Sequence, residues 1–370
     1  MLGKEFAMKQ LTLAQIDPNF AIPEKVAPAD LKYYDPTEEP FRVYGLILPT
    51  PEENYFHRMP TSVAAATNPG VLELEQQTAG GRIRFCTDSP YVVVRVSFPK
   101  ASHFAHMPKT GSAGLDLYEA AEDGTQRYVG TFIPRYAAET GFESMVKFPG
   151  QGMHRVTINM PSYNRVSQIQ IGLSGSAKLE KAPDYRYERP VVFYGSSITQ
   201  GGCASRPGNA YTSLLCRNCD CNYINLGFSG SGKGETVMAE YIAGLDMSVF
   251  VMDYDHNAPT PEHLQATHQP FFKIIREKKP DLPILMVTRP KLHLNAEDQR
   301  RWEIIRTTYE NAVEAGDKNV YFVDGNAFFR GTAEEGATVD NSHPNDLGFW
   351  AMAKYMEPIL RQALEMSVER

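Results

Sequence analysis

The chain has 370 residues, of which 42% are hydrophobic and 22% charged, and its formal net charge is −7. This length can form one large domain or two, and the composition excludes a disordered, collagen-like or disulfide-scaffold protein. The acidic balance leaves no overall basic field for a polyanion, so we expect no nucleic-acid partner. Five cysteines are an odd number, which argues against a complete disulfide framework.

No stretch of the sequence approaches the roughly 20 uninterrupted apolar residues of a membrane helix, so we expect a soluble protein. The first 20 residues include Lys4, Glu5 and Lys9 and never form the apolar segment of a signal peptide. The sequence as it stands therefore predicts a cytoplasmic protein, although a secretory leader removed ahead of this start would leave the same residues.

Residues 40–180 alternate apolar and polar side chains in short runs, and turn-rich pieces separate the runs. Alternation with β-branched residues predicts strands, and no segment here keeps helical spacing for long. We expect an antiparallel β-sandwich over residues 1–185. The expected strands are 43–48, 83–86, 91–98, 154–160 and 167–173.

Residues 186–370 show a different pattern, in which apolar runs are separated by amphipathic stretches. Near-continuous apolar strands are typical of a parallel sheet covered on both faces. We expect a three-layer α/β/α domain of flavodoxin-like winding, with ligands at the carboxyl ends of its strands. The expected strands are 191–195, 221–227, 248–254, 283–288 and 320–325, and the clearest helices are 261–279, 296–316 and 346–366.

Two adjacent serines, Ser196 and Ser197, follow the first of these strands. A serine at a strand-to-helix turn lies at the carboxyl edge of the sheet, where the N-terminus of the next helix favours developing negative charge. That position suits a nucleophile. The competing interpretation is that both serines only cap the helix.

The next two strands end in a glycine-rich segment, 225–235, and in the run Asp253 to Asn257. The glycines around Gly230 let backbone amides approach closely, which suits the binding of an oxyanion or a phosphate. The segment has neither the Walker nor the dinucleotide-binding spacing of glycines, and a flexible loop explains the glycines equally well. The side chain of Asn257 could supply another oxyanion donor. His256 with the nearby aspartates could suggest a metal, but the sequence offers no second histidine at a suitable spacing, so we expect none.

The last polar cluster, Asp340-Asn341-Ser342-His343, precedes the final helix. An aspartate three residues before a histidine can hold one ring nitrogen while the other faces a serine. The simpler alternative is that Asp346 caps the helix and His343 is an exposed turn residue.

Residues 191–365 resemble the SGNH/GDSL hydrolase superfamily, which has four characteristic sequence blocks. The matching segments occur here in the same order, as YGSSITQGG, NLGFSGSG, DYDHN and DNSHPND. The resemblance implies that Ser197 is the nucleophile, His343 the general base and Asp340 its orienting acid. It implies an oxyanion hole from the amides of Ser197 and Gly230 and the side chain of Asn257, with no cofactor. Two positions depart from the pattern, since Ser196 and Ala258 stand where the superfamily usually has Asp.

The segment Gly114 to Tyr118 is similar to the GxDLY signature of a β-rich domain that precedes one subgroup of these hydrolases. Two-domain esterases with an N-terminal jelly roll include carbohydrate deacetylases. The resemblance therefore favours a serine esterase for short-chain, acetyl esters, including O-acetyl groups on a small molecule or oligosaccharide. A longer-chain lipase or thioesterase at the same site and a catalytically impaired carbohydrate-binding protein remain as alternatives, and the oligomeric state is not predicted.

Two other motifs have competing explanations. The segment Tyr55 to Pro60 could reach the active site from the first half or could pack between the two halves. Cys216, Cys219 and Cys221 have a C-x-x-C-x-C spacing, but without a fourth ligand nearby we expect no zinc there.

Overall fold

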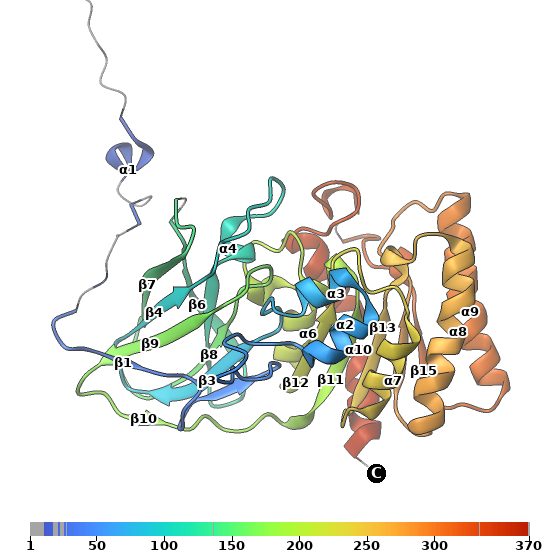
Figure 1. The fold of residues 1–370 in the computed structure, drawn as a ribbon, viewed down its shortest axis with the longest axis horizontal. Coiled ribbons are helices and arrows are strands. Elements are labelled where there is room, and N and C mark those ends of the chain that lie inside the picture. Colours follow the sequence, from blue (N-terminus) through green and yellow to red (C-terminus); the bar gives the residue numbers. More distant parts are fainter. Residues whose placement is uncertain are drawn as a thin grey trace, which may run out of the picture.

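The computed structural model describes residues 11–17, 21–22, 26, 28–135, 137–332 and 334–368. Two antiparallel sheets come from the first half of the chain and one parallel sheet from the second, and they lie side by side (Figure 1). Within these described ranges, no helix is long and apolar enough to cross a membrane.

The first half forms the predicted antiparallel sandwich, because alternate side chains of its strands enter one shared apolar core. This half of the chain also contains the short helices α1 (Leu13–Ile16) and α4 (Lys109–Ser112). The first sheet contains, in spatial order, β1 (Leu31–Tyr34), β9 (Gln168–Ser174), β4 (Tyr91–Ser97) and β7 (Gly141–Lys147). The second contains β10 (Leu179–Glu180), β3 (Arg82–Thr87), β8 (His154–Asn159), β5 (Leu115–Ala120) and β6 (Gln126–Phe132), with β2 (Arg42–Tyr44) also paired to β3.

The strand expected over 43–48 is shorter in the structure, because β2 ends at Tyr44. The next residue, Gly45, has a φ of +76°, and a Cβ there would lie 2.6 Å from the carbonyl oxygen of Gly80. The chain therefore turns away from the sheet where its apolar pattern continues.

The second half is the predicted three-layer α/β/α domain of flavodoxin-like winding. Its parallel sheet has the spatial order 2-1-3-4-5 when its strands are numbered along this half. On β11 (Tyr187–Gly195), Val191 and Phe193 point into one helical layer, while Val192 and Tyr194 point into the other. The other strands are β12 (Cys221–Gly227), β13 (Val249–Asp253), β14 (Ile284–Val287) and β15 (Val320–Val323). Helices α6 (Tyr211–Cys219) and α10 (Asp346–Val368) cover one face, and α7 (Thr236–Gly244), α8 (Pro261–Lys278) and α9 (Ala296–Glu314) cover the other.

A helical segment of the first half packs on the second half. Ala64 of α2 (Thr61–Thr67) and Val71 of α3 (Pro69–Leu74) are fully buried and belong to the same apolar core as residues of α7 and α8. Helix α2 contacts α7 (Figure 1). Just before them, the buried Arg58 donates hydrogen bonds to the carbonyl oxygens of Gly227 and Leu74. The segment Tyr55 to Pro60 therefore packs between the halves, which is the second of its two proposed roles.

The aspartate of the GxDLY signature also joins the two halves. Asp116, on β5, is fully buried, and its Oδ2 accepts a hydrogen bond of 2.9 Å from the backbone N–H of Gly208. Arg206 lies 3.3 Å from the same oxygen, and Asn159 donates to Oδ1 at 2.8 Å. A buried carboxylate without hydrogen-bond partners would cost free energy of folding. These bonds therefore fix the position of η2 (Pro207–Asn209) against the sandwich.

Candidate active site

The Ser197 turn is the tight connection from β11 to α5 (Ser197–Gln200). Ser196 is the N-cap of this short helix, and its side chain accepts a hydrogen bond from the backbone N–H of Ile198 at 3.2 Å. Ser197 is the first helical residue, so its own N–H has no partner within the helix. A Cβ at Gly195 would lie 2.1 Å from Thr199 Oγ1, which is why the turn needs glycine there. The two serines thus have different roles, and only Ser196 caps.

The structure brings Ser197, His343 and Asp340 into one hydrogen-bonded chain. Ser197 Oγ lies 2.9 Å from His343 Nε2, and His343 Nδ1 lies 2.8 Å from Asp340 Oδ2. The other oxygen of Asp340 accepts hydrogen bonds from the backbone N–H groups of His343 at 2.7 Å and Ser342 at 3.1 Å. Partial desolvation acts to raise the pKa of Asp340, but these hydrogen bonds outweigh it and hold the pKa below its usual value. The carboxylate therefore stays charged opposite the imidazole.

The segment that carries His343 is fixed by the residues around the start of α10. Asn345, rather than Asp346, supplies the capping oxygen, since its Oδ1 accepts from the backbone N–H of Gly348 at 3.1 Å. The carboxylate of Asp346 instead accepts from the backbone N–H of Ser205 and from Asn209 Nδ2, both at 2.8 Å. The alternative role of Asp346 as the helix cap is therefore wrong, and its actual bonds join the His343 loop to the turn that follows α5.

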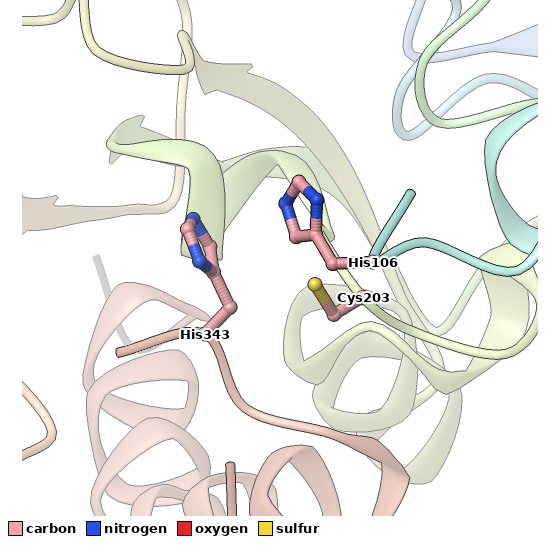
Figure 2. Close-up of side chains that lie close together, drawn as sticks. All are labelled: His106, Cys203 and His343. Carbon is pink, nitrogen blue, oxygen red and sulfur yellow. The ribbon is translucent and has the colours of Figure 1, made fainter. Parts of the chain in front are cut away.

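Two residues that the sequence did not single out lie beside His343. His106, exposed on a loop of the first half, has its ring centroid 5.6 Å from that of His343, and the buried Cys203 lies next to both (Figure 2). These side chains come from three separate segments of the chain. Their proximity depends on how the two halves pack, and no local spacing could have indicated it.

The two other expected oxyanion donors belong to neighbouring loops. Gly230 is the third residue of a turn in which the N–H of Ser231 donates to the carbonyl of Phe228 at 2.9 Å. Its φ of +66° is the left-handed conformation that this position of a type II turn requires. Asn257 Nδ2 donates to the same carbonyl at 2.8 Å, and the N–H of Phe228 donates to Gly195 at 2.9 Å. All three loops are thus connected at the carboxyl edge of the sheet.

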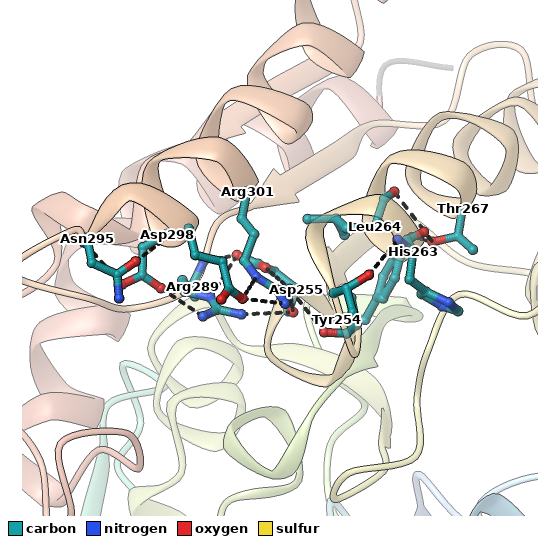
Figure 3. A network of polar contacts seen from close by, with 12 residues as sticks. Tyr254, Asp255, His263, Leu264, Thr267, Arg289, Asn295, Asp298 and Arg301 are labelled. Carbon is teal, nitrogen blue, oxygen red and sulfur yellow. Dashed lines mark hydrogen bonds and ion pairs between the residues drawn. The ribbon is translucent and has the colours of Figure 1, made fainter.

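Asn257 is held by a buried ionic network beneath it, in η3 (Asp255–Asn257). Asp255 accepts hydrogen bonds from the backbone N–H of Arg289 at 3.0 Å and from its Nε at 3.3 Å, and Arg301 donates to the carbonyl of Ala258 at 3.0 Å (Figure 3). Arg289 also pairs with Asp298 at 2.8 Å. The Asp255 carboxylate is committed to two arginines, which leaves the metal alternative at His256 without structural support.

Comparison with known proteins identifies the family of this chain. A family model described as GDSL-like lipase/acylhydrolase matches residues 188–361, and a model of the N-terminus of SGNH-hydrolase-type esterases matches residues 31–179. A Bacteroides ovatus structure described as a GDSL-like lipase is 32% identical over 90% of this chain and 98% of its own, with a TM-score of 0.79. The chain belongs to the GDSL-like lipase/acylhydrolase family.

More distant structures share the fold of this GDSL-family ester hydrolase. The salicylyl-acyltransferase SsfX3 of a tetracycline biosynthetic pathway is 22% identical, with 90% of this chain and 98% of its own covered and a TM-score of 0.73. A family two carbohydrate esterase from Clostridium thermocellum is 17% identical, and the match covers 78% of this chain and 94% of that chain with a TM-score of 0.57. No protein with a curated description matches the chain.

The Ser197 turn of the hydrolase contacts a buried aspartate. Asp253, at the end of β13, accepts hydrogen bonds from Thr199 Oγ1 at 2.9 Å and from the Tyr211 hydroxyl at 2.7 Å. Desolvation raises the pKa of Asp253 to about 7, although both hydrogen bonds act to lower it. Asp253 therefore links the helix that begins at Ser197 to the centre of the sheet.

Replacing Asp253 by asparagine should stabilise the hydrolase at alkaline pH. The pKa of this carboxyl is higher in the folded protein than in the unfolded chain. Its contribution to the free energy of unfolding is therefore fully present at a pH below the unfolded-state pKa and is lost as the pH rises towards 7. The asparagine side chain has no such loss and keeps an acceptor for Thr199 and Tyr211. One pKa unit corresponds to about 1.36 kcal/mol. The difference in the free energy of unfolding between Asp253→Asn and the wild type should therefore be roughly 2–3 kcal/mol more in favour of the variant at pH 8 than at pH 5.

Thermal unfolding at the two pH values measures this effect. The exposed Asp246→Asn, which removes a carboxylate 80% accessible to solvent, is the matched control and should show no such difference. A stability difference for Asp253→Asn that is equal at pH 5 and pH 8 would contradict the assignment of a raised pKa.

Proposed function

We propose that Ser197 attacks the carbonyl carbon of a carboxylic ester and that His343 removes its proton. The observation that carries this proposal is the 2.9 Å contact between Ser197 Oγ and His343 Nε2, with Asp340 on the opposite ring nitrogen. Asp340 holds Nδ1 protonated, so Nε2 is free to accept the proton, and the charged carboxylate stabilises the imidazolium that results. His343 then returns the proton to the leaving alcohol, and water attacks the acyl-enzyme in a second, equivalent cycle.

Three groups are proposed to stabilise the oxyanion, namely the backbone N–H groups of Ser197 and Gly230 and the side chain of Asn257. Asn257 Nδ2 carries two protons, and the bond to Phe228 uses one of them. The second is available to the substrate. Because Asp255, Arg289 and Arg301 fix the backbone on either side of this side chain, the donor is preorganised.

Replacing Asn257 by alanine should lower kcat about 10²–10³-fold with little change in KM, because the lost donor acts mainly on charge that develops in the transition state. Steady-state kinetics on p-nitrophenyl acetate measure this change. Asn218→Ala removes an exposed side-chain amide that bonds Glu357 and is the matched control. An unchanged kcat for Asn257→Ala would remove this side chain from the oxyanion hole.

For the substrate, we propose a short acyl group, acetyl in particular, on an alcohol that can be a carbohydrate hydroxyl. The fold is shared by the Clostridium thermocellum carbohydrate esterase, solved with cellohexaose, and by an acetyl xylan esterase from Butyrivibrio proteoclasticus, which supports this proposal.

Hydrolysis of p-nitrophenyl acetate, butyrate and octanoate, measured beside acetate release from acetylated oligosaccharides, tests the acyl preference. We expect kcat/KM to fall steeply beyond butyrate. A maximum at octanoate would favour a longer-chain lipase, and a maximum on acyl thioesters a thioesterase. Binding of oligosaccharides without turnover of any ester would favour the carbohydrate-binding alternative.

A further inference from the structure

Beside the proposed triad, three potential metal ligands converge. One ligand atom from each of His106, Cys203 and His343 lies within 4.8 Å of the other two (Figure 2). His106 comes from the first half, Cys203 from the turn after α5, and His343 from the loop before α10. Cys203 has a φ of +72°, an uncommon conformation for a residue other than glycine, and its side chain is directed inward, with 4% of the residue exposed.

We propose that His106, Cys203 and His343 form an inhibitory zinc site. Two imidazoles and a thiolate are ligands that Zn²⁺ prefers, and three protein ligands leave the fourth tetrahedral position for water. Zn–N and Zn–S bonds of about 2.0–2.3 Å place the ligand atoms of a tetrahedral site roughly 3.5 Å apart, so the cluster has to close by about 1 Å. His106 can supply this movement, because its side chain is exposed on a loop.

Zinc in this position would block the proposed reaction. The lone pair of His343 that would accept the Ser197 proton would instead bind the metal, and the 2.9 Å hydrogen bond between the two side chains would be lost. On binding, Zn²⁺ takes up the three protein ligands, keeps one of its waters and releases the others, and the Cys203 thiol releases its proton to solvent. No electron is transferred, so removal of the metal restores the enzyme. The loss of activity rests on the proposed role of His343, whereas metal binding itself does not.

Titration with Co²⁺ tests the site without reference to activity, since a cobalt–thiolate bond has a charge-transfer absorption band. We expect one Co²⁺ per chain in the wild type, displaced by Zn²⁺, and no such band in Cys203→Ala. His106→Ala changes an exposed side chain and should weaken Zn²⁺ binding at least about 100-fold. Mutation of a residue that only hydrogen-bonds a metal ligand already lowers metal affinity about 10–100-fold, and His106 would be a ligand itself. His103→Ala, on the same loop, and Cys86→Ala, which removes a buried thiol on β3, are the matched controls.

A thiolate band that survives in Cys203→Ala would place the metal at other cysteines, such as the buried Cys216, Cys219 and Cys221, and would overturn the proposal. The same holds if the wild type shows no band, or if His106→Ala and His103→Ala bind equally well.

Inhibition provides the second measurement. Zn²⁺ should abolish hydrolysis of p-nitrophenyl acetate by the wild type, a chelator should restore it, and the concentration for half inhibition should rise at least about 100-fold in His106→Ala relative to that variant's own metal-free rate. Stimulation by zinc, or inhibition unaltered in His106→Ala, would overturn the inhibitory role. Ser197→Ala should lack activity and still show the cobalt band, so failure of the proposed mechanism and failure of the metal site are distinguishable.

Discussion

Replacing Ser197 by alanine is expected to reduce kcat by about 10⁴–10⁶-fold, the loss typical when a serine nucleophile is removed from a triad. The remaining activity would come from the oxyanion donors and from substrate binding. Hydrolysis of p-nitrophenyl acetate measures the rate, and mass spectrometry after treatment with a fluorophosphonate measures covalent labelling. We expect one label per wild-type chain, located on Ser197, and no label on the variant.

Ser196→Ala is the decisive control, because this serine is adjacent in sequence and has a different role. Its hydroxyl caps α5 through Ile198, so its removal should cost about 1 kcal/mol of stability. It should leave labelling intact and activity within about tenfold of the wild type, since loss of a cap does not remove the nucleophile. Labelling that persists in Ser197→Ala and disappears in Ser196→Ala would show that Ser196, rather than Ser197, is the nucleophile.

The second half was predictable in detail because its strands are buried on both faces. Apolar runs such as 191–195 and 283–288 have no polar interruption, and the ends of α8, α9 and α10 differ from the predicted helices by at most two residues. Parallel strands also determine where a site lies, since their carboxyl ends meet at one edge. The positions of Ser197, Gly230 and Asn257 after successive strands therefore indicated one common site.

The sandwich was less predictable where its strands are only partly covered. β6 has a single fully buried residue, and β7 alternates weakly around Phe142 and Val146, so neither shows a clear period of two. The segment 61–74 is helical, but its short helices contribute too few buried residues to show helical spacing. Their location on the α/β core depends on long-range packing that the local sequence does not specify.

The hydrogen-bonded chain of Asp340, His343 and Ser197 could be predicted more fully than its surroundings. The D-x-x-H spacing places Asp340 and His343 on one turn, which is a local property, and the order of the sequence blocks added Ser197. The role of Asp116 could not be derived in this way, because its partners Arg206 and Gly208 lie across the interface between the halves. His106 and Cys203 are subject to the same limit, since their approach to His343 follows from that interface.

The contact between Asp340 and His343 carries the second large expected effect, in which asparagine is more damaging than alanine. Two backbone N–H groups, those of Ser342 and His343, point at Oδ1 of Asp340. In Asp340→Asn they would hold the amide oxygen in that place and turn the NH₂ group towards His343 Nδ1. A donor facing Nδ1 forces the proton onto Nε2, and Nε2 can then no longer accept the proton of Ser197.

We therefore expect Asp340→Asn to lower kcat by about 10³–10⁴-fold, as the wrong histidine tautomer does in a comparable triad. Asp340→Ala should lose less, because the carboxylate is 38% exposed and water can take its place at Nδ1. ¹⁵N NMR of His343 reports the tautomer directly and should show the proton on Nδ1 in the wild type and on Nε2 in Asp340→Asn. The control Asp123→Asn, in an exposed turn of the first half, should alter neither quantity. If the alanine variant were the slower of the two with the tautomer unchanged, Asp340 would act by holding the loop in place rather than by orienting the imidazole.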